Sequence, residues 1–422
     1  TDETKQNIIS NVIENTLTVY FADGTPAITE SNIASESMTF TQSICDESKL
    51  KFGGCIAAEF SIDVLNTPSR TFTLNELVGK DIYAVLTMEY IDITQVYPSA
   101  TLCPASKLLP GGKIKSLDFK IFCGRIASAK LDQNNPQKRH VIAYDAFADL
   151  YSLDYTNILY DLWNNPQTIN SILSSLNLYI LRFYPVPINT SKYLKYINDR
   201  MNKYTVQNNE WLKSNSKISC GQALNYICEI LGCFGVVDYT SNQQQAQINI
   251  LDLQKSECET YDFYQNLNAE EFQSKGYQYI SVSNKNTDRS SKITSNDYTS
   301  DSITIDSNKS YDMTDNIFLY QGSDVSMPVA GTDAIYIILS GGTADKLALC
   351  NYTPFSATVD GRPWMNAGDK IKINSYKTDV YGNYVLDSDG NRVVTTVESY
   401  ILSRTLTGIK SLTDKITAKG AN

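Results

Sequence analysis

The only histidine of the chain, His140, has the widest chemical repertoire of any residue here, and it follows Lys138-Arg139 after a predicted hairpin turn. Histidine can act as a general base or bind a metal, but both roles need partner residues. One histidine excludes zinc sites built on several histidines, and it makes any serine or cysteine triad depend on His140 alone. Because no nucleophile elbow or similar motif accompanies it, we interpret His140 as a surface residue at the start of a strand.

The cysteines are odd in number and scattered, without C-x-x-C pairs. The nine are Cys45, Cys55, Cys103, Cys123, Cys220, Cys228, Cys233, Cys258 and Cys350. This usage indicates free, buried thiols in a protein that folds in a reducing cytoplasm. Cys220, Cys228 and Cys233 fall in one predicted helix and its exit, at spacings unlike those of metal knuckles, so packing is the favoured role.

Three further patterns are incomplete versions of known sites. Residues 110–113 (Pro-Gly-Gly-Lys) lack the earlier glycine and the following Ser or Thr of a phosphate-binding loop, which indicates a turn. Residues 387–391 with Glu398 have the spacing of a calcium loop, but Arg392 stands where that loop needs glycine, and the flanks are predicted strands. Glu270-Glu271 could act as glycosidase carboxylates only across a cleft, and a solvated face is the ordinary interpretation. The sequence therefore predicts no catalytic, cofactor-binding or metal-binding residue, and we expect a protein that is not an enzyme.

Composition sets the scale of the fold. The 422 residues are 42% hydrophobic and 19% charged, which predicts two to four folded domains. The formal charge of −10 argues against nonspecific nucleic-acid binding, although an acidic wall would suit a conduit through which DNA slides. We expect no signal peptide in the polar residues 1–14, and no segment approaches the roughly 20 apolar residues of a membrane span.

The N-terminal part is predicted to be a short arm or helix followed by strands. In residues 1–17 the apolar side chains Ile8, Ile9, Val12 and Ile13 share one helical face. Over residues 18–145, short alternating segments separated by Gly, Pro and Asn predict a closed or nearly closed β-barrel. Closure would also remove exposed strand edges.

Residues 146–254 change to helical periodicity. Asp145 is a predicted helix cap, and Ser219 with Gln222 forms a capping box before an apolar face that ends at Gly232. A hairpin is predicted to follow over residues 234–251. These features predict a small α/β domain.

Alternation returns in the last part of the chain. Residues 255–310 and 352–422 predict a second β-barrel, in which 283–301 is a polar loop or an exposed hairpin, and 311–351 is a small insertion. Gly361-Arg362-Pro363-Trp364 and Gly368-Asp369 mark two turns beside strands. The predicted fold class is therefore mainly β with an α/β part (α+β): two similar β-barrels flanking a small α/β domain.

Four stretches resemble the hub proteins of phage tails and related contractile injection machines. Residues 32–45 with 50–55 resemble the first-barrel signature of tail hubs from prophages of Gram-positive bacteria, and 119–145 resembles the entry to the next domain. Residues 219–253 are similar to the α/β domain of that family, and 352–373 with 398–420 look like its closing barrel.

The resemblance implies a structural baseplate or tail-tip hub. In that family two like barrels per chain let a homotrimer form a pseudo-sixfold ring, which joins the hexameric tail tube to a threefold tip and lines the channel. The implied partners are tail-tube or distal tail proteins and a spike or tape-measure protein, with DNA only in transit. The implied location is the virion or a phage-like particle assembled in the bacterial cytoplasm.

Several alternatives stay open at this stage. Contractile and non-contractile tails, and phages and phage-like devices, fit equally well. Many members of the family continue into a peptidase, lysozyme or fibre region, which these 422 residues do not include. A β-rich receptor- or carbohydrate-binding tail protein, with 283–301 as its contact loop, is the alternative function. A cell-wall hydrolase that depends on His140 is a third.

Overall fold

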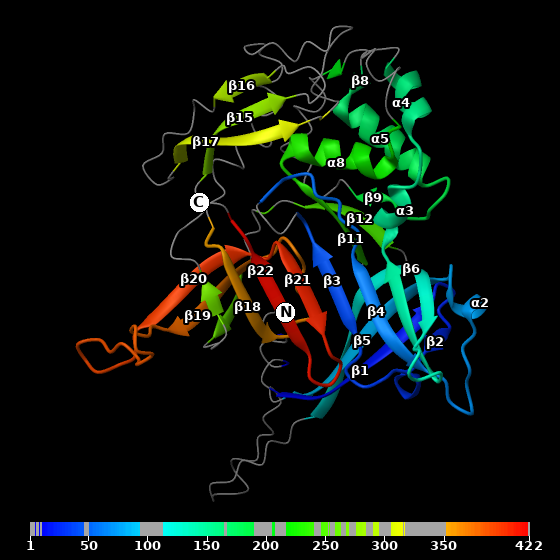
Figure 1. The fold of residues 1–422 in the computed structure, drawn as a ribbon, viewed down its shortest axis with the longest axis vertical. Coiled ribbons are helices and arrows are strands. Elements are labelled where there is room, and N and C mark those ends of the chain that lie inside the picture. Colours follow the sequence, from blue (N-terminus) through cyan, green and yellow to red (C-terminus); the bar gives the residue numbers. More distant parts are fainter. Residues whose placement is uncertain are drawn as a thin grey trace, which may run out of the picture.

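The computed structural model describes most of the chain, and strands dominate it, so the prediction of a mainly β protein is confirmed. The described residues are 5, 8, 11–45, 50–92, 113–163, 167–189, 205–206, 217–239, 246–251, 253, 258–262, 267–269, 276–283, 290–294, 305–314, 316 and 352–420. Figure 1 shows the large sheet in the lower half of the molecule and the helices above it. No helix in the described ranges has the length and apolar character needed to cross a membrane.

An eleven-stranded antiparallel sheet forms the body of the molecule. In spatial order its strands are β14 (Leu267–Ala269), β18 (Phe355–Asp360), β22 (Thr413–Ala418), β21 (Ser403–Thr407), β3 (Thr39–Ser43), β4 (Glu59–Leu65), β7 (Lys138–Tyr144), β6 (Lys113–Leu131), β5 (Asp81–Asp92), β1 (Val12–Phe21) and β2 (Pro26–Ile28). The pairing of β3 with β21 places Thr41 opposite Thr405. One continuous hydrogen-bonded sheet therefore joins the two ends of the sequence.

Smaller sheets flank this body. The strands β13 (Cys258–Asp262), β19 (Lys370–Tyr376) and β20 (Val394–Tyr400) form one, and β11 (Phe234–Tyr239), β12 (Ala246–Leu251) and β9 (Ile188–Asn189) form another. A third contains β16 (Ser290–Thr294), β15 (Gly276–Ser283) and β17 (Ile305–Thr314), and β10 (Thr205–Val206) pairs with β8 (Gln167–Thr168).

The helices gather at one end of the sheet, except α2 (Leu74–Leu77) and the 3-10 turn η1 (Glu30–Asn32). They are α3 (Ala146–Leu150), α4 (Thr156–Trp163), α5 (Ile169–Ile180) and α8 (Cys220–Leu231). The predicted capping box of α8 is present, since Ser219 accepts a hydrogen bond from the amide of Gln222 and Gln222 accepts one from Ser219. Gly232 ends the helix at a φ of 63°, in the left-handed region that glycine tolerates best.

Two similar closed barrels are not what the described strands form. Their main sheet has a linear order with β14 and β2 at its ends, and β3 pairs with β21 as well as with β4, which joins the N-terminal and C-terminal strands. The N-terminal strands follow the order β4-β7-β6-β5-β1, whereas the C-terminal strands divide between the main sheet and the separate β13-β19-β20 sheet. Alternation identifies strands and their faces, but it carries no information on which edges pair.

Local predictions also need correction. β1 begins at Val12, so Val12 and Ile13 lie exposed in a strand that pairs with β5, although the periodicity placed them on a helical face. Residues 283–301 were open to two interpretations, a polar loop or an exposed hairpin, and the antiparallel pairing of β16 (290–294) with β15 agrees with the hairpin. Residues 311–314 belong to β17 rather than to an insertion, and except for Asn316 the rest of 311–351 lies outside the described residues.

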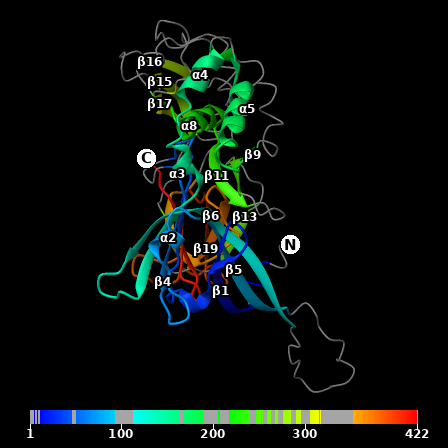
Figure 2. The same cartoon turned by 90° about the vertical axis from the view of Figure 1, so that its right-hand side faces the viewer.

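The buried apolar side chains form two clusters. One lies under the N-terminal strands, where the rings of Phe60 and Phe122 stack at 5.1 Å and Phe40 meets Phe122 edge-on at 6.2 Å. The other runs from the helices into the C-terminal strands. Trp364 packs against both clusters, so the Gly-Arg-Pro-Trp turn joins them. The second view shows the helices stacked on one end of the sheet rather than on its face (Figure 2).

Candidate functional site

His140 lies in a surface ion-pair cluster. Its Nδ1 is 2.8 Å from Asp63 Oδ1, and Lys138 Nζ is 2.7 Å from the other oxygen of the same carboxylate. The β4–β7 register places Asp63 opposite His140. Burial alone would raise the pKa of Asp63, but hydrogen bonds from Lys138 and His140 outweigh burial and hold that pKa below its usual value. In these contacts the imidazole links β7 to β4 through the Asp63 carboxylate.

Most of the described thiols are buried. Cys55 Sγ lies 4.0 Å from Cys228 Sγ, with both side chains inside the apolar cluster. Burial raises the pKa of Cys220 to about 12, which keeps this thiol protonated and unreactive. Cys103 and Cys350 lie outside the described residues, as does the side chain of Cys258. No group of three His, Cys, Asp or Glu in the described ranges is arranged to hold a metal ion.

The remaining sequence patterns are not brought together. Glu398 pairs with Lys372 at 2.8 Å on the β19–β20 sheet, while Asp387 closes a turn beyond the ends of those strands. A calcium loop that uses both residues is therefore not formed. The Gly-Gly part of residues 110–113 and the Glu270-Glu271 pair lie outside the described residues.

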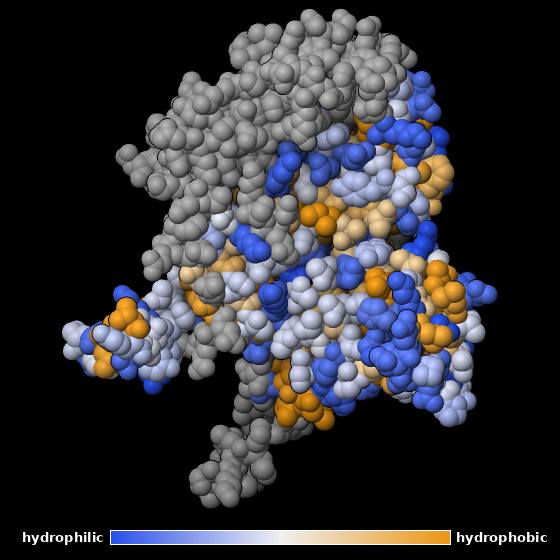
Figure 3. Space-filling view, viewed as in Figure 1, coloured by the Kyte–Doolittle hydropathy of each residue, from blue (hydrophilic) through white to orange (hydrophobic). Residues whose placement is uncertain are grey.

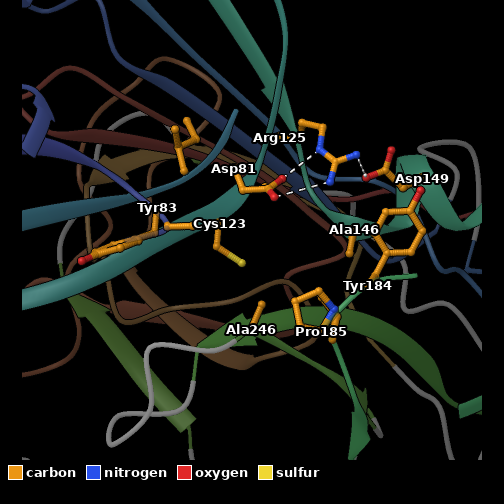
Figure 4. Close-up of a pocket in the computed structure, with 13 residues that line it drawn as sticks. Asp81, Tyr83, Cys123, Arg125, Ala146, Asp149, Tyr184, Pro185 and Ala246 are labelled. Atoms are coloured by element: carbon orange, nitrogen blue, oxygen red, sulfur yellow. Dashed lines mark hydrogen bonds and ion pairs between the residues drawn. The ribbon is translucent and has the colours of Figure 1, made fainter. Parts of the chain in front are cut away.

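A pocket of about 140 Å³ lies where the main sheet meets the helices (Figure 4). Arg125 on β6 donates to Asp81 at 2.8 Å, and its guanidinium is 3.5 Å from Asp149 on α3. The guanidinium also lies 5.6 Å from the ring centre of Tyr184. Two carboxylates thus balance the one cation, which leaves it no free charge for a bound anion.

The same pocket is poorly equipped for catalysis. Burial raises the pKa of the Cys123 thiol, so it remains protonated at neutral pH. The volume of about 140 Å³ is also below the roughly 300 Å³ at which small-molecule sites begin. The arrangement therefore serves to hold β5, β6 and α3 against one another.

A buried ion pair lies at the C-terminal strands. Arg404 and Asp414 are both fully buried and pair through the guanidinium, which also donates to the carbonyl oxygens of Met365 and Arg362. Arg404 shares the inward face of β21 with Leu406, and Asp414 shares the inward face of β22 with Ile416. The signal for this pair in the sequence is one charged residue on the apolar face of each strand, and it is not among the predicted sites.

A second buried contact extends from the Gly-Arg-Pro-Trp turn. Arg362 donates to Glu259 at 3.1 Å, and its guanidinium lies 3.7 Å from the ring centre of Tyr261. Lys5 Nζ is 2.8 Å from the same Glu259. These charges connect Lys5 near the N-terminus, β13 and the Gly-Arg-Pro-Trp turn, so their role is to stabilise the fold.

One element projects from the body and carries exposed apolar side chains. Residues 376–394, here called the arm, continue the β19–β20 hairpin and stand out at the left of Figure 1. The sequence Asp-x-x-Gly-Asn occurs twice in it, at 379–383 and 387–391. In each turn the aspartate accepts hydrogen bonds from the amides two and four residues ahead, at 2.8 to 2.9 Å.

The arm is stiffened by aromatic contacts. Arg392 lies 4.2 Å from the ring centre of Tyr384 and 5.1 Å from that of Tyr376. The two rings meet edge-on at 5.6 Å. Val380 and Tyr381 in its first turn are nevertheless 93% and 85% exposed, and Figure 3 shows hydrophobic residues on this projection. A stiff projection that presents apolar side chains to water is typical of a contact surface.

Comparison with known proteins gives distant similarities only. No family model matches the chain, and no curated protein matches it. Among solved structures, the chain is similar to the tail protein from Neisseria meningitidis MC58 and to the 43 kDa tail protein of prophage MuSo2 from Shewanella oneidensis. For each, the TM-score is 0.45 at 10% identity, over 96% of both chains. These similarities do not assign this chain to a family.

Proposed function

We propose that this chain is a structural protein of a phage tail or phage-like injection particle, and that it acts as a baseplate or tail-tip hub. Three copies form a ring with a central channel, which joins the hexameric tail tube to a threefold tip. Tube or distal tail proteins bind one side of this ring, a spike or tape-measure protein binds the other, and DNA or cargo passes through.

The continuous eleven-stranded sheet is the observation that carries the proposal. The β3–β21 ladder links strands more than 350 residues apart, as in Ser43 opposite Ser403, so the two ends of the chain form one mechanical unit. A continuous sheet that packs against the helices at one end and carries a projecting arm suits a scaffold that transmits load between partners. The pocket and polar clusters described above hold this scaffold together.

Charge is consistent with a conduit. The formal charge of −10 repels phosphate, so a channel built from this chain would let DNA slide without retaining it. The strand order of the two halves differs, as described above. A pseudo-sixfold ring therefore requires the two halves to present matching surfaces to the tube through different strand arrangements, which is a demanding condition.

Imaging of the intact particle by electron cryomicroscopy tests the proposal directly. We expect three copies of the chain around a channel at the end of the tail tube. Finding the chain on a peripheral fibre, with isolated protein binding cell-surface glycans, would instead support the receptor-binding alternative. Absence of the chain from the particle would overturn the structural role altogether.

A further inference from the structure

A groove with exposed apolar side chains lies on the opposite side of the molecule from the arm. An open groove of about 610 Å³ runs between α2 and the end of β6, and it is lined by Leu74, Val78 and Leu131. Leu74 is 51% exposed and Leu131 is 49% exposed, so this lining is apolar and wet. In Figure 1 the arm lies at the left edge and α2 at the right edge, with the main sheet between them.

We propose that the first turn of the arm, residues 379–383, inserts into the α2–β6 groove of a second copy of this chain. Val380 and Tyr381 provide the apolar contact, and the groove receives them. The inference rests on the proposed ring and names the surfaces through which its copies associate. Because the two surfaces differ, the contact is head-to-tail, and repetition of a head-to-tail contact closes a ring when the rotation allows it.

Charge complementarity points to a second copy as the occupant of the groove. The two turns of the arm carry Asp379, Asp387 and Asp389, and its cations Lys377 and Arg392 lie outside those turns, whereas Lys130 and Arg139 line the groove. Hydrogen bonds from the backbone of Asn383 and Asn391 hold the pKa values of Asp379 and Asp387 below the usual value, so both remain ionised at neutral pH. Acidic turns, the first of which carries the apolar pair, thus match an apolar groove that is lined by two basic residues.

The groove is also built to keep its shape. Arg139 donates to the carbonyl oxygens of Phe72 at 2.9 Å and Ala129 at 3.3 Å, which fixes its guanidinium beside the apolar lining. The acidic residue of α2, Glu76, pairs with Arg70 at 3.4 Å and caps the helix through the amide of Thr73. Its charge is therefore compensated within the same molecule, and the rim remains basic. A rigid arm and a rigid groove lose little conformational freedom on association.

The test is the mass of the full-length chain in solution, measured by light scattering across a concentration series. We expect the wild-type chain to form trimers. The arm variant Val380→Asp/Tyr381→Ser and the groove variant Leu131→Glu should each lose the trimer, because each removes one side of the contact. Leu178→Asp, at a site on α5 that is 66% exposed but lies outside both surfaces, is the matched control and should keep the wild-type mass.

Mixing the variants separates this contact from other modes of association. An arm variant still has a groove and a groove variant still has an arm, so an equimolar mixture should give a capped dimer and no ring. Wild-type trimers with trimeric arm and groove variants would overturn the inference and leave the hub proposal standing. A wild-type chain that stays monomeric at every concentration would also overturn it, and imaging of the particle would then decide the hub proposal separately.

Discussion

Beneath β4, β7 and β6 the main sheet is stabilised by aromatic packing, whereas beneath β21 and β22 the same sheet encloses an ion pair. Phe40, Phe60 and Phe122 fill the first region. Arg404 and Asp414 occupy the second. Apolar burial tolerates partial relaxation, but a buried charge tolerates the loss of its partner poorly. The sheet therefore has an aromatic half, in which the loss of a side chain is partly accommodated, and an ion-pair half, in which the loss of one partner is not.

A single substitution in the ion-pair half should cause the largest loss of stability. Arg404→Met leaves Asp414 buried without a partner and removes the donor to two carbonyl oxygens, so we expect the free energy of unfolding to fall by about 5 kcal/mol. Urea unfolding of the full chain measures the loss. Burial without a cation raises the folded-state pKa of Asp414, so the deficit should shrink as the pH falls and a proton neutralises the carboxylate.

Two further variants make this result specific to burial. Arg404→Met/Asp414→Leu replaces the pair by apolar groups and should recover most of the lost stability. Lys410→Met removes an exposed cation that pairs with Glu14 at 3.3 Å and Glu30 at 3.5 Å, and it should leave stability nearly unchanged because water screens such pairs. Equal losses for Arg404→Met and Lys410→Met would end the contrast between the two halves.

The aromatic half is tested by Phe60→Ala. Removing a ring that stacks on Phe122 at 5.1 Å leaves a cavity, and we expect a loss of about 3 kcal/mol. Unlike the loss in Arg404→Met, this loss should be the same at pH 5 and pH 8, since no titratable group is exposed or unpaired. Phe60→Leu fills most of the cavity and should recover part of the loss, as urea unfolding at both pH values would report. A clear pH dependence of the Phe60→Ala deficit would contradict this assignment.

A third change addresses the turn that joins the halves. A Cβ at position 361 would lie 2.5 Å from Leu412 Cγ and 2.8 Å from Leu406 Cδ1, so Gly361→Ala should cost about 1–3 kcal/mol through overpacking. Gly382→Ala in the arm is the comparison, because nothing lies within 4 Å and only its φ of 83° opposes a side chain. That backbone effect should be about 1 kcal/mol. Thermal unfolding measures both losses of stability. A smaller loss for Gly361→Ala than for Gly382→Ala would show that the turn rearranges to accommodate the added methyl group.

Sequence patterns predicted the local elements far better than their assembly. The α8 helix from Ser219 to Gly232 was predictable because its caps and apolar face are encoded within fourteen neighbouring residues. The β3–β21 ladder was not, since a strand edge presents the same backbone groups to any partner. The prediction of two barrels is not confirmed for that reason. The Arg404–Asp414 pair lies across the neighbouring strands β21 and β22, so a charge on the apolar face of each strand was a local signal for it.

The candidate sites show the same contrast between what the local sequence encodes and what depends on the fold. Interpreting His140 as a surface residue needed only its lack of companions, but its partner Asp63 is 77 residues away and depends on the β4–β7 register. The repeated Asp-x-x-Gly-Asn of the arm was readable in the sequence, and the two turns were its local consequence. That the arm and the groove lie on opposite sides of the molecule depends on the whole fold, which no local pattern encodes.

The smallest expected effect concerns His140 itself. Its contact with Asp63 is half-exposed and Lys138 shares the carboxylate, so His140→Ala should lower stability by under about 1 kcal/mol. The lowered pKa of Asp63 means that its stabilising contribution is present above pH 3.8 and is lost as the pH falls through the folded-state value. Asp63→Asn should therefore flatten the acid limb of the stability curve more than His140→Ala does.

The same variant addresses the hydrolase alternative, because a hydrolase that used this imidazole would lose all activity with it. We expect His140→Ala to change assembly and cell-wall clearing no more than Lys138→Ala, which disturbs the same carboxylate without touching the ring. If a zymogram showed wall clearing that only His140→Ala abolished, the charge cluster between β4 and β7 would be a catalytic site. The contrast between the two halves of the sheet would then concern chemistry as well as stability.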